Sequence, residues 1–132
     1  MKISLERAIA EYRPGEPIRG RIEWSPEETS IQSLDVRLIW YTRGKGTRDV
    51  EVIAQQSLPA ATANGQQPFQ FTAPRGPFSF SGKLISLVWA IEAIAKPGRD
   101  AERIDLEIAP EGKEILLSTL DKVPMDPQAE VP

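Results

Sequence analysis

The stretch EYRPGEPIRGRIEW, residues 11–24, joins a tight turn to the alternating pattern of a β-strand. Pro14 fixes φ and Gly15 accepts the positive φ that a tight turn requires, so we expect the chain to reverse there. After the turn, the odd positions from 19 to 23 are charged and the even positions are apolar or small, which predicts a strand with its even side facing a core. The inward positions are Ile18, Gly20, Ile22 and Trp24.

Gly20 falls on the inward side of this predicted strand, where a larger side chain would normally pack. A glycine inside a strand indicates a β-bulge, a bend, or the close crossing of another strand or a large side chain. We therefore expect another part of the core to fill the space beside Gly20.

Short strand-like segments separated by turn residues continue along the chain. The most apolar run, residues 84–95, also fits helical periodicity, but its β-branched and aromatic content and the flanking glycines and proline favour a strand. Seven or eight such strands without a convincing helix predict an antiparallel, immunoglobulin-like β-sandwich. The expected strands cover residues 3–9, 17–24, 33–42, 50–58, 69–71, 84–95, 102–110 and 115–117.

Composition argues against several classes of function. The 132 residues contain no His and no Cys, so the usual general base, thiol nucleophiles and common transition-metal ligands are missing. The net charge of −3 does not supply the positive field of a general nucleic-acid binder. No apolar run is long enough to span a bilayer, and the charged N-terminus is unlike a secretory signal, so we expect a cytoplasmic protein without a membrane span.

The order of the motifs resembles the N-terminal domain of arrestin-like proteins, with α-arrestins and bacterial arrestin-like proteins the most similar. In that family a Y-x-P-G-E turn leads into a strand with an inward glycine, and an F-x-F strand and an S-F-x-G segment precede a long apolar strand. The resemblance covers residues 3–110 and implies an adaptor or scaffold that performs no chemistry. The matching positions are Tyr12, Pro14, Gly15, Glu16, Gly20, Phe69, Phe71, Pro74, Pro77, Ser79, Phe80, Gly82 and Trp89.

The sequence departs from that family in three respects. It has room for one sandwich where arrestins have two. The phosphate-sensing pair of lysines has no match, because Lys2 stands alone, and no P-P-x-Y motif occurs. The family's partners and regulation are therefore not carried over. We expect one arrestin-like domain over residues 1–110, and then over residues 111–132 a short edge strand and a mobile, Pro-rich tail.

The outward positions of two central strands are unusually apolar, with Ile39 and Tyr41 on one strand and Val88 and Ala90 on the other. A contiguous apolar group on that face indicates a surface covered by another protein, a second copy or another domain. Alternatively, these residues follow β-propensity and are covered by a loop or by the C-terminal tail. Our first hypothesis is a protein-binding domain that uses this face or an exposed strand edge, with a foreign partner or as a homodimer.

A second hypothesis places a small anionic ligand on the loop at residues 43–49. Arg43, Lys45 and Arg48 accompany two glycines there, and backbone N–H groups with cationic side chains can hold a phosphate or a carboxylate. The spacing is not that of a Walker loop. The competing interpretation is a solvated hairpin, because charged residues are ordinary on exposed loops.

Two further hypotheses are disfavoured by the same pattern. A glycosidase would need paired carboxylates across a cleft, and nothing in the sequence builds a cleft around the candidate acids. A sugar-stacking platform would need exposed tryptophans, whereas all three fall on inward positions and are expected in the core. We therefore predict no enzyme, no cofactor and no metal. The acids are Glu16, Glu23, Glu27 and Glu28, and the tryptophans are Trp24, Trp40 and Trp89.

Overall fold

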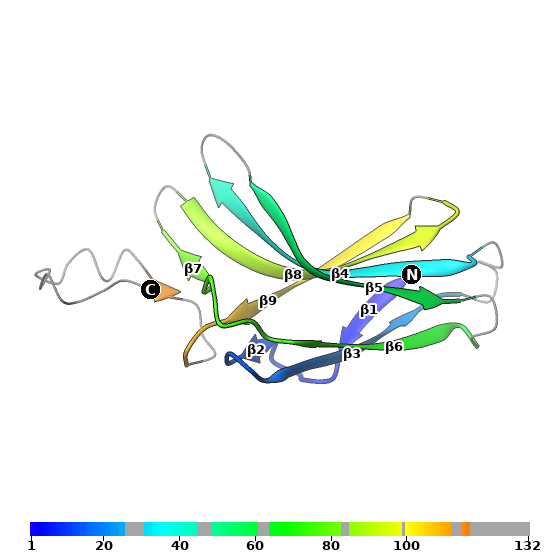
Figure 1. The fold of residues 1–132 in the computed structure, drawn as a ribbon, viewed down its shortest axis with the longest axis horizontal. Coiled ribbons are helices and arrows are strands. Elements are labelled where there is room, and N and C mark those ends of the chain that lie inside the picture. The colour runs from blue at the N-terminus through cyan, green and yellow to red at the C-terminus, as the bar shows by residue number, and fades with distance from the viewer. Residues whose placement is uncertain are drawn as a thin grey trace, which may run out of the picture.

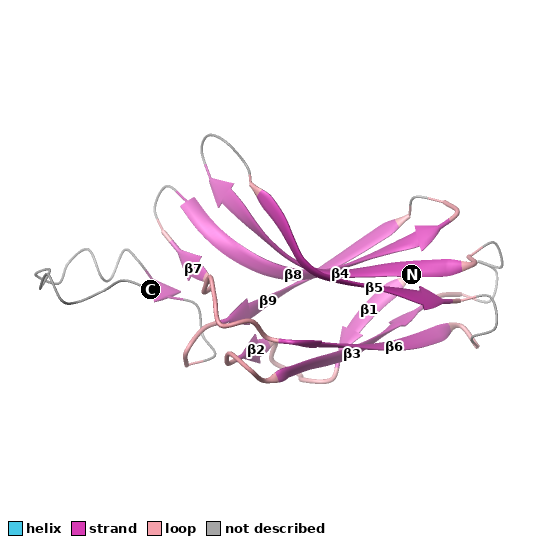
Figure 2. Ribbon diagram, viewed as in Figure 1, coloured by secondary structure: helices cyan, strands magenta, loops and turns pink. Residues whose placement is uncertain are grey.

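A computed structural model shows an all-β protein, as predicted (Figures 1 and 2). It describes residues 1–25, 31–44, 49–60, 64–82, 85–98, 100–111 and 115–116. Within these residues there is no helix. The strands are β1 (Lys2–Leu5), β2 (Glu11–Tyr12), β3 (Pro17–Glu23), β4 (Ser33–Gly44), β5 (Val50–Pro59), β6 (Gln66–Thr72), β7 (Phe80–Ser81), β8 (Ile85–Lys96), β9 (Ala101–Ile108) and β10 (Ile115–Leu116).

Two sheets pack face to face, so the predicted β-sandwich is confirmed (Figure 1). The small sheet has the order β1-β3-β6, and the large sheet has the order β10-β7-β8-β4-β5, with β9 beside β8 and β2 beside β9. Pairs are antiparallel except for the two-residue pairings β2–β9 and β10–β7, which are parallel. The short strands β2 and β7 raise the number above the expected seven or eight, and β10 corresponds to the short edge strand expected at residues 115–117. The expected Pro-rich tail, residues 121–132, lies outside the described residues.

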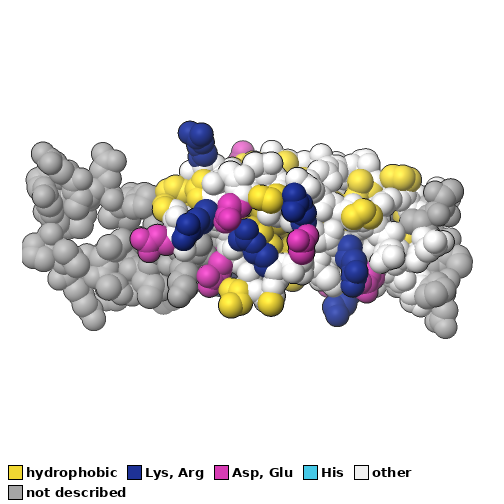
Figure 3. Space-filling model, turned by 90° about the horizontal axis from the view of Figure 1, so that it is seen from below, with side chains coloured by type: hydrophobic (Ala, Val, Ile, Leu, Met, Phe, Trp, Pro, Cys, Tyr) yellow, Lys and Arg dark blue, Asp and Glu magenta, His cyan; other side chains and the backbone are white. Residues whose placement is uncertain are grey.

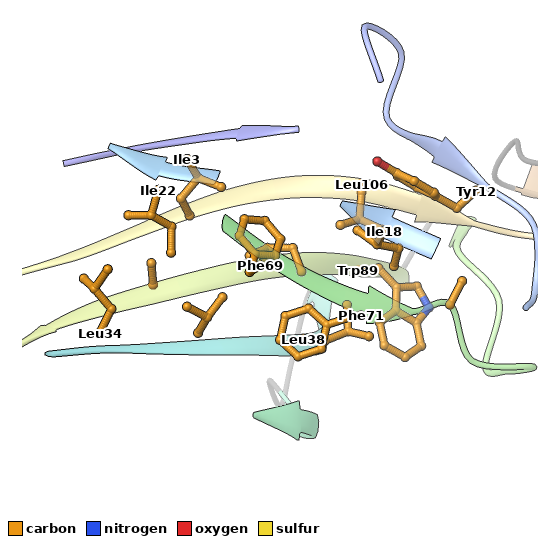
Figure 4. Close-up of a cluster of buried hydrophobic side chains, with 14 of the residues drawn as sticks. Ile3, Tyr12, Ile18, Ile22, Leu34, Leu38, Phe69, Phe71, Trp89 and Leu106 are labelled. Carbon is orange, nitrogen blue, oxygen red and sulfur yellow. The ribbon is translucent and has the colours of Figure 1, made fainter. Parts of the chain in front are cut away.

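The core lies between the sheets and is built from one face of each long strand (Figure 4). Ile18 and Ile22 on β3 are fully buried, as the alternation predicted. The run that also fitted a helix is the twelve-residue strand β8, whose Trp89 and Ile91 are fully buried. The two longest strands, β4 and β8, pair along their whole length at the centre of the large sheet.

Gly20 touches the aromatic ring of Phe69, its partner across the β3–β6 pair. A Cβ atom at Gly20 would lie 2.7 Å from Cζ of Phe69 and would also collide with the carbonyl oxygen of Ser4 on β1. The predicted close crossing is therefore real: a large side chain occupies the space that the glycine leaves.

The Y-R-P-G-E motif is a structural clamp. Gly15 has φ +86°, and the Glu16 carboxylate accepts hydrogen bonds from the Arg13 N–H at 2.7 Å and from Arg7 at 3.0 Å. The Arg7 guanidinium also lies 4.5 Å from the ring centre of buried Tyr12. These contacts hold the β2–β3 turn against the segment after β1, and they keep the pKa of Glu16 below its usual value, chiefly through the bond from Arg7.

Three positions are less buried than the alternation predicted: Trp24, Trp40 and Ile85, which shares its side of residues 84–95 with Trp89. Trp24 and Trp40 are only partly buried and pack against the edge of the core, whereas Trp89 lies inside it and donates from Nε1 to the Pro77 carbonyl at 2.8 Å. Ile85 is 42% exposed. It pairs with Gly44 at the end of β8, where the large sheet bends away from the small one (Figure 1). A parity pattern cannot show how far the covering sheet extends.

Candidate functional site

The four outward residues singled out from the sequence lie together on the outer face of the large sheet. Ile39 pairs with Ala90 and Tyr41 pairs with Val88 across β4 and β8. The four residues form a hydrophobic cluster separate from the main core, and we call it the outer cluster. Ile39, Tyr41 and Ala90 are at most 8% exposed although no second sheet covers them within the described chain.

Two side chains of β9 contact Tyr41 of the outer cluster. The Arg103 guanidinium of β9 lies 4.4 Å from the ring centre of Tyr41, an attractive cation–π geometry. The Tyr41 hydroxyl donates to the Asp105 carboxylate at 3.1 Å. Burial, followed by the negative charge of Asp105, raises the pKa of Tyr41. The centre of the face is therefore sealed, and a partner would meet mainly its margins.

The exposed apolar surface of this face lies on β5, the edge strand next to β4. Val50, Val52 and Ile53 are 63%, 47% and 41% exposed. Val50 pairs with Tyr41 and Val52 pairs with Ile39, so this group borders the outer cluster directly. We call these three residues the β5 strip. Together, the strip and the cluster form one apolar area that runs across three strands.

A β-bulge creates the β5 strip. The register of the β4–β5 pair shifts between Leu38, which pairs with Ala54, and Ile39, which pairs with Val52, so Ile53 is an extra residue. Glu51 and Ala54 both pair with inward residues of β4, which leaves Val52 and Ile53 together on the outer side. The sequence analysis missed these residues, although two adjacent apolar residues inside an alternating segment were a signal.

The two halves of β5 differ in how they are held. Near its C-terminal end, Gln56 donates to the Gln70 carbonyl and Gln67 donates to the Pro59 carbonyl, both at 2.5 Å, and these bonds link β5 to β6 of the small sheet. No such link reaches Val50–Ile53 among the described residues, and no described strand pairs with the outer edge of β5.

Arginines mark both ends of the apolar area on β4. Arg37 lies on β4 two residues before Ile39, on the same face. Its guanidinium lies 3.9 Å from the Glu92 carboxylate, and its Nε is buried without a hydrogen-bond partner. Arg43 lies on β4 two residues after Tyr41, on the same face, and is exposed. It forms no ion pair within the described part of the chain. Of the described acidic side chains of the face, Asp35 lies on β4 and pairs with Lys96, and Glu92 and Asp105 lie on β8 and β9.

Of the three residues in the anion-binding hypothesis, the structure describes Arg43, whereas Lys45 and Arg48 lie outside the described residues. Arg43 lines a hollow of about 270 Å³ that it shares with Asp105 and Glu107. These carboxylates would repel a phosphate or a carboxylate ligand. The surroundings of Arg43 therefore do not favour an anion.

The opposite face, over the small sheet, carries charges of both signs in alternation with apolar groups (Figure 3). A shallow hollow of about 750 Å³ lies there, with Gly20 in its floor between Arg19 and Arg21. Arg19 donates to Gln70 at 3.1 Å and Arg21 pairs with Glu23, so both arginines already have partners. This hollow is wide and open and holds no convergent group of catalytic type.

The acids considered for glycoside hydrolysis do not face each other across a cleft. Glu16 belongs to the turn clamp and Glu23 pairs with Arg21, while Glu27 and Glu28 lie outside the described residues. In the part of the chain that the structure describes, no group of three acidic side chains is placed to hold a metal ion. None of the described segments is a helix long and apolar enough to cross a membrane.

Comparison with known proteins extends the fold assignment. The sequence matches no protein-family model and no curated protein. Among solved structures, the sporulation control protein Spo0M of Bacillus subtilis is similar, with a TM-score of 0.50 and 19% sequence identity over 81% of this chain and 47% of Spo0M. The chain thus spans about half the length of Spo0M. Because Spo0M has an arrestin-like fold, the similarity supports an arrestin-like fold here.

Proposed function

We propose that this chain is a non-catalytic protein-interaction domain, an adaptor or scaffold, that binds its partner through the outer face of the large sheet. The observation that carries the proposal is the β5 strip, three exposed aliphatic side chains beside the buried outer cluster. Contiguous exposed apolar groups rimmed by charged residues are typical of protein–protein contact sites. The partner is a foreign protein or a second copy of the chain, in the cytoplasm that the sequence analysis predicts.

The absence of His and Cys from the sequence supports a role without chemistry. The side chains of this face whose pKa is shifted, Tyr41 and Asp35, moreover have structural partners that explain the shift. Tyr41 is held by Asp105 and Arg103, and Asp35 is held by Lys96 at 2.7 Å and by Ser57 at 2.9 Å. Such paired groups stabilise a sheet surface and are not free to act as a nucleophile or a base.

The test compares matched variants in affinity capture from cell extract and in sedimentation velocity over a concentration series. Val52→Asp places a charge in the β5 strip, and Thr72→Asp places the same charge on exposed β6 of the other sheet. We expect Val52→Asp to abolish capture of a partner, or the self-associated species, while Thr72→Asp behaves as wild type. Equal behaviour of the two variants would refute the proposal.

The alternative function, binding of a small anion at the loop 43–49, is the weaker proposal because Arg43 lies beside Asp105 and Glu107. Thermal shift with inorganic phosphate tests it. A site filled at 100 times its dissociation constant adds about 2.7 kcal/mol of stability. A rise in the melting temperature that disappears in Arg43→Gln would revive this alternative.

A further inference from the structure

We infer that a small hollow beside the Tyr12 hydroxyl is a binding site for structural water, which bridges that hydroxyl to the side chains of Glu6 and Arg19. The inference concerns the margin of the small sheet and does not depend on the proposed function. It follows from three observations: a buried hydroxyl without a partner, a polar hollow beside it, and the balance of charge around that hollow.

The Tyr12 hydroxyl is buried and has no hydrogen-bond partner among the described residues. Tyr12 as a whole is 1% exposed, and its ring belongs to the main core cluster (Figure 4). Burial raises the pKa of this hydroxyl, so it stays protonated and can both donate and accept a hydrogen bond. A buried hydroxyl without any bond destabilises the folded state, and native proteins rarely keep one. We therefore expect a partner that comes from solvent.

The Tyr12 side chain has little freedom to turn its hydroxyl toward another part of the chain. Its main-chain carbonyl accepts from the Ala109 N–H at 3.1 Å, where β2 pairs with β9. The Arg7 guanidinium lies 4.5 Å from the ring centre and is itself held by two bonds to the Glu16 carboxylate. The hydroxyl is therefore fixed in place, and its partner must come to it.

A hollow of about 90 Å³ lies at this position, with walls from the segment after β1, from β2 and from β3. A water molecule takes about 30 Å³ in the liquid, so the hollow has room for one to three of them. Glu6 and Arg19 also line the wide hollow over the small sheet, so solvent can enter from that side. The lining residues are Glu6, Arg7, Tyr12, Pro17 and Arg19.

The walls of the hollow offer the partners that a bound water needs. The Glu6 N–H donates to the Arg19 carbonyl at 2.9 Å, so these two residues are held next to each other. Arg19 donates from Nε to Gln70 at 3.1 Å, and its two terminal nitrogens form no hydrogen bond with the described residues. The Glu6 carboxylate supplies acceptors. Together with the Tyr12 hydroxyl, these groups can make the two to four polar contacts that are typical of a buried water.

The charges around the hollow favour a neutral molecule over an ion. Arg7 is paired with Glu16 at 3.0 Å, and the charge of Arg19 is balanced by that of Glu6 across the hollow. An anion would meet the Glu6 carboxylate, and a cation would meet two guanidinium groups. An apolar ligand would leave the Tyr12 hydroxyl unpaired. Water is the neutral donor and acceptor that fits this volume.

A high-resolution crystal structure of the full chain tests the inference directly. We expect an ordered water about 2.5–3.0 Å from Oη of Tyr12, with a second contact to Glu6 or to Arg19. A hollow without ordered water beside Oη would overturn the inference. A protein group bonded to Oη would overturn it as well.

Thermal melts of Tyr12→Phe provide a test in solution, because this change removes the hydroxyl and keeps the ring. If water satisfies the hydroxyl, the melting temperature should fall by about 2–5 °C. Tyr41→Phe is the matched control, since it loses a hydroxyl that is bonded to Asp105, and it should show a similar fall. A hydroxyl without a partner would give the opposite sign, so an unchanged or raised melting temperature in Tyr12→Phe would overturn the inference.

Discussion

The two faces of the large sheet use the same strands in different ways. On the inner face, Trp89 and Ile91 of β8 are sealed by the small sheet. On the outer face, Ile39 and Ala90 are buried just as deeply, and among the described residues they pack with Tyr41 and Val88, with Arg103 over the Tyr41 ring. The exposed apolar atoms are displaced to the edge strand β5. Deep burial on the outer face therefore reflects stability, and the proposed binding surface lies beside it.

The largest effect is expected on the inner face. Trp89→Ala removes the largest fully buried side chain and its hydrogen bond to Pro77, so the free energy of unfolding should fall by about 3–5 kcal/mol. Urea unfolding followed by tyrosine or remaining tryptophan fluorescence measures this change. A loss below about 1 kcal/mol would mean that the two sheets do not pack through Trp89.

A smaller loss is expected within the small sheet, where β3 lies against the Phe69 ring and β1 at Gly20. Gly20→Ala forces a Cβ atom against Phe69 and the Ser4 carbonyl, so overpacking should cost about 1–3 kcal/mol. Gly98→Ala is the matched control, because nothing lies within 4 Å of the atom it adds. The comparison is made by urea unfolding. Equal stability of the two variants would contradict the close contact of Gly20 with Phe69 and Ser4.

The outer face should separate stability from binding. Ile39→Ala removes a side chain that is 2% exposed, so we expect a loss of about 2 kcal/mol in the free energy of unfolding. Ile53→Asp changes an exposed position and should alter stability by no more than about 0.5 kcal/mol. If partner capture is lost with Ile39→Ala at full stability and kept with Ile53→Asp, the roles of the outer cluster and the β5 strip are reversed.

The smallest effect concerns acid stability on the outer face. The bonds from Lys96 and Ser57 hold the pKa of Asp35 below its usual value, so the unfolded chain binds this proton more readily than the folded chain. The stabilisation is therefore complete above the ordinary aspartate pKa of about 4 and is lost as the pH falls through the folded pKa. Thermal melts from pH 7 to pH 2 should show a shallower decline for Asp35→Asn. An identical slope for the two proteins would contradict this role.

Sequence reasoning predicted features that depend on alternation. The inward side of β3, the strand character of β8 and the close contact at Gly20 all follow from patterns within a few residues. It also brought Ile39, Tyr41, Val88 and Ala90 together, because parity and strand order decide which residues share a face.

Features that depend on how strands pair and how the two sheets pack were missed. The exposure of Val52 and Ile53 depends on a bulge and on the place of β5 at the sheet edge, and neither is encoded in parity. Trp40 was expected inside the core, yet it is only partly buried and packs against it. The domain boundary at residue 110 and the binding roles of the site residues stay predictions.

Site-specific photo-crosslinking in living cells tests the central claim most directly. A photoreactive amino acid replaces Val52 in one version of the protein and Thr72, on the opposite sheet, in another. We predict that the probe at position 52 forms one discrete adduct, that the probe at position 72 does not form it, and that Ile53→Asp abolishes it. Adducts that are the same from both positions, or that survive Ile53→Asp, would contradict the claim that the outer face of the large sheet is the binding surface.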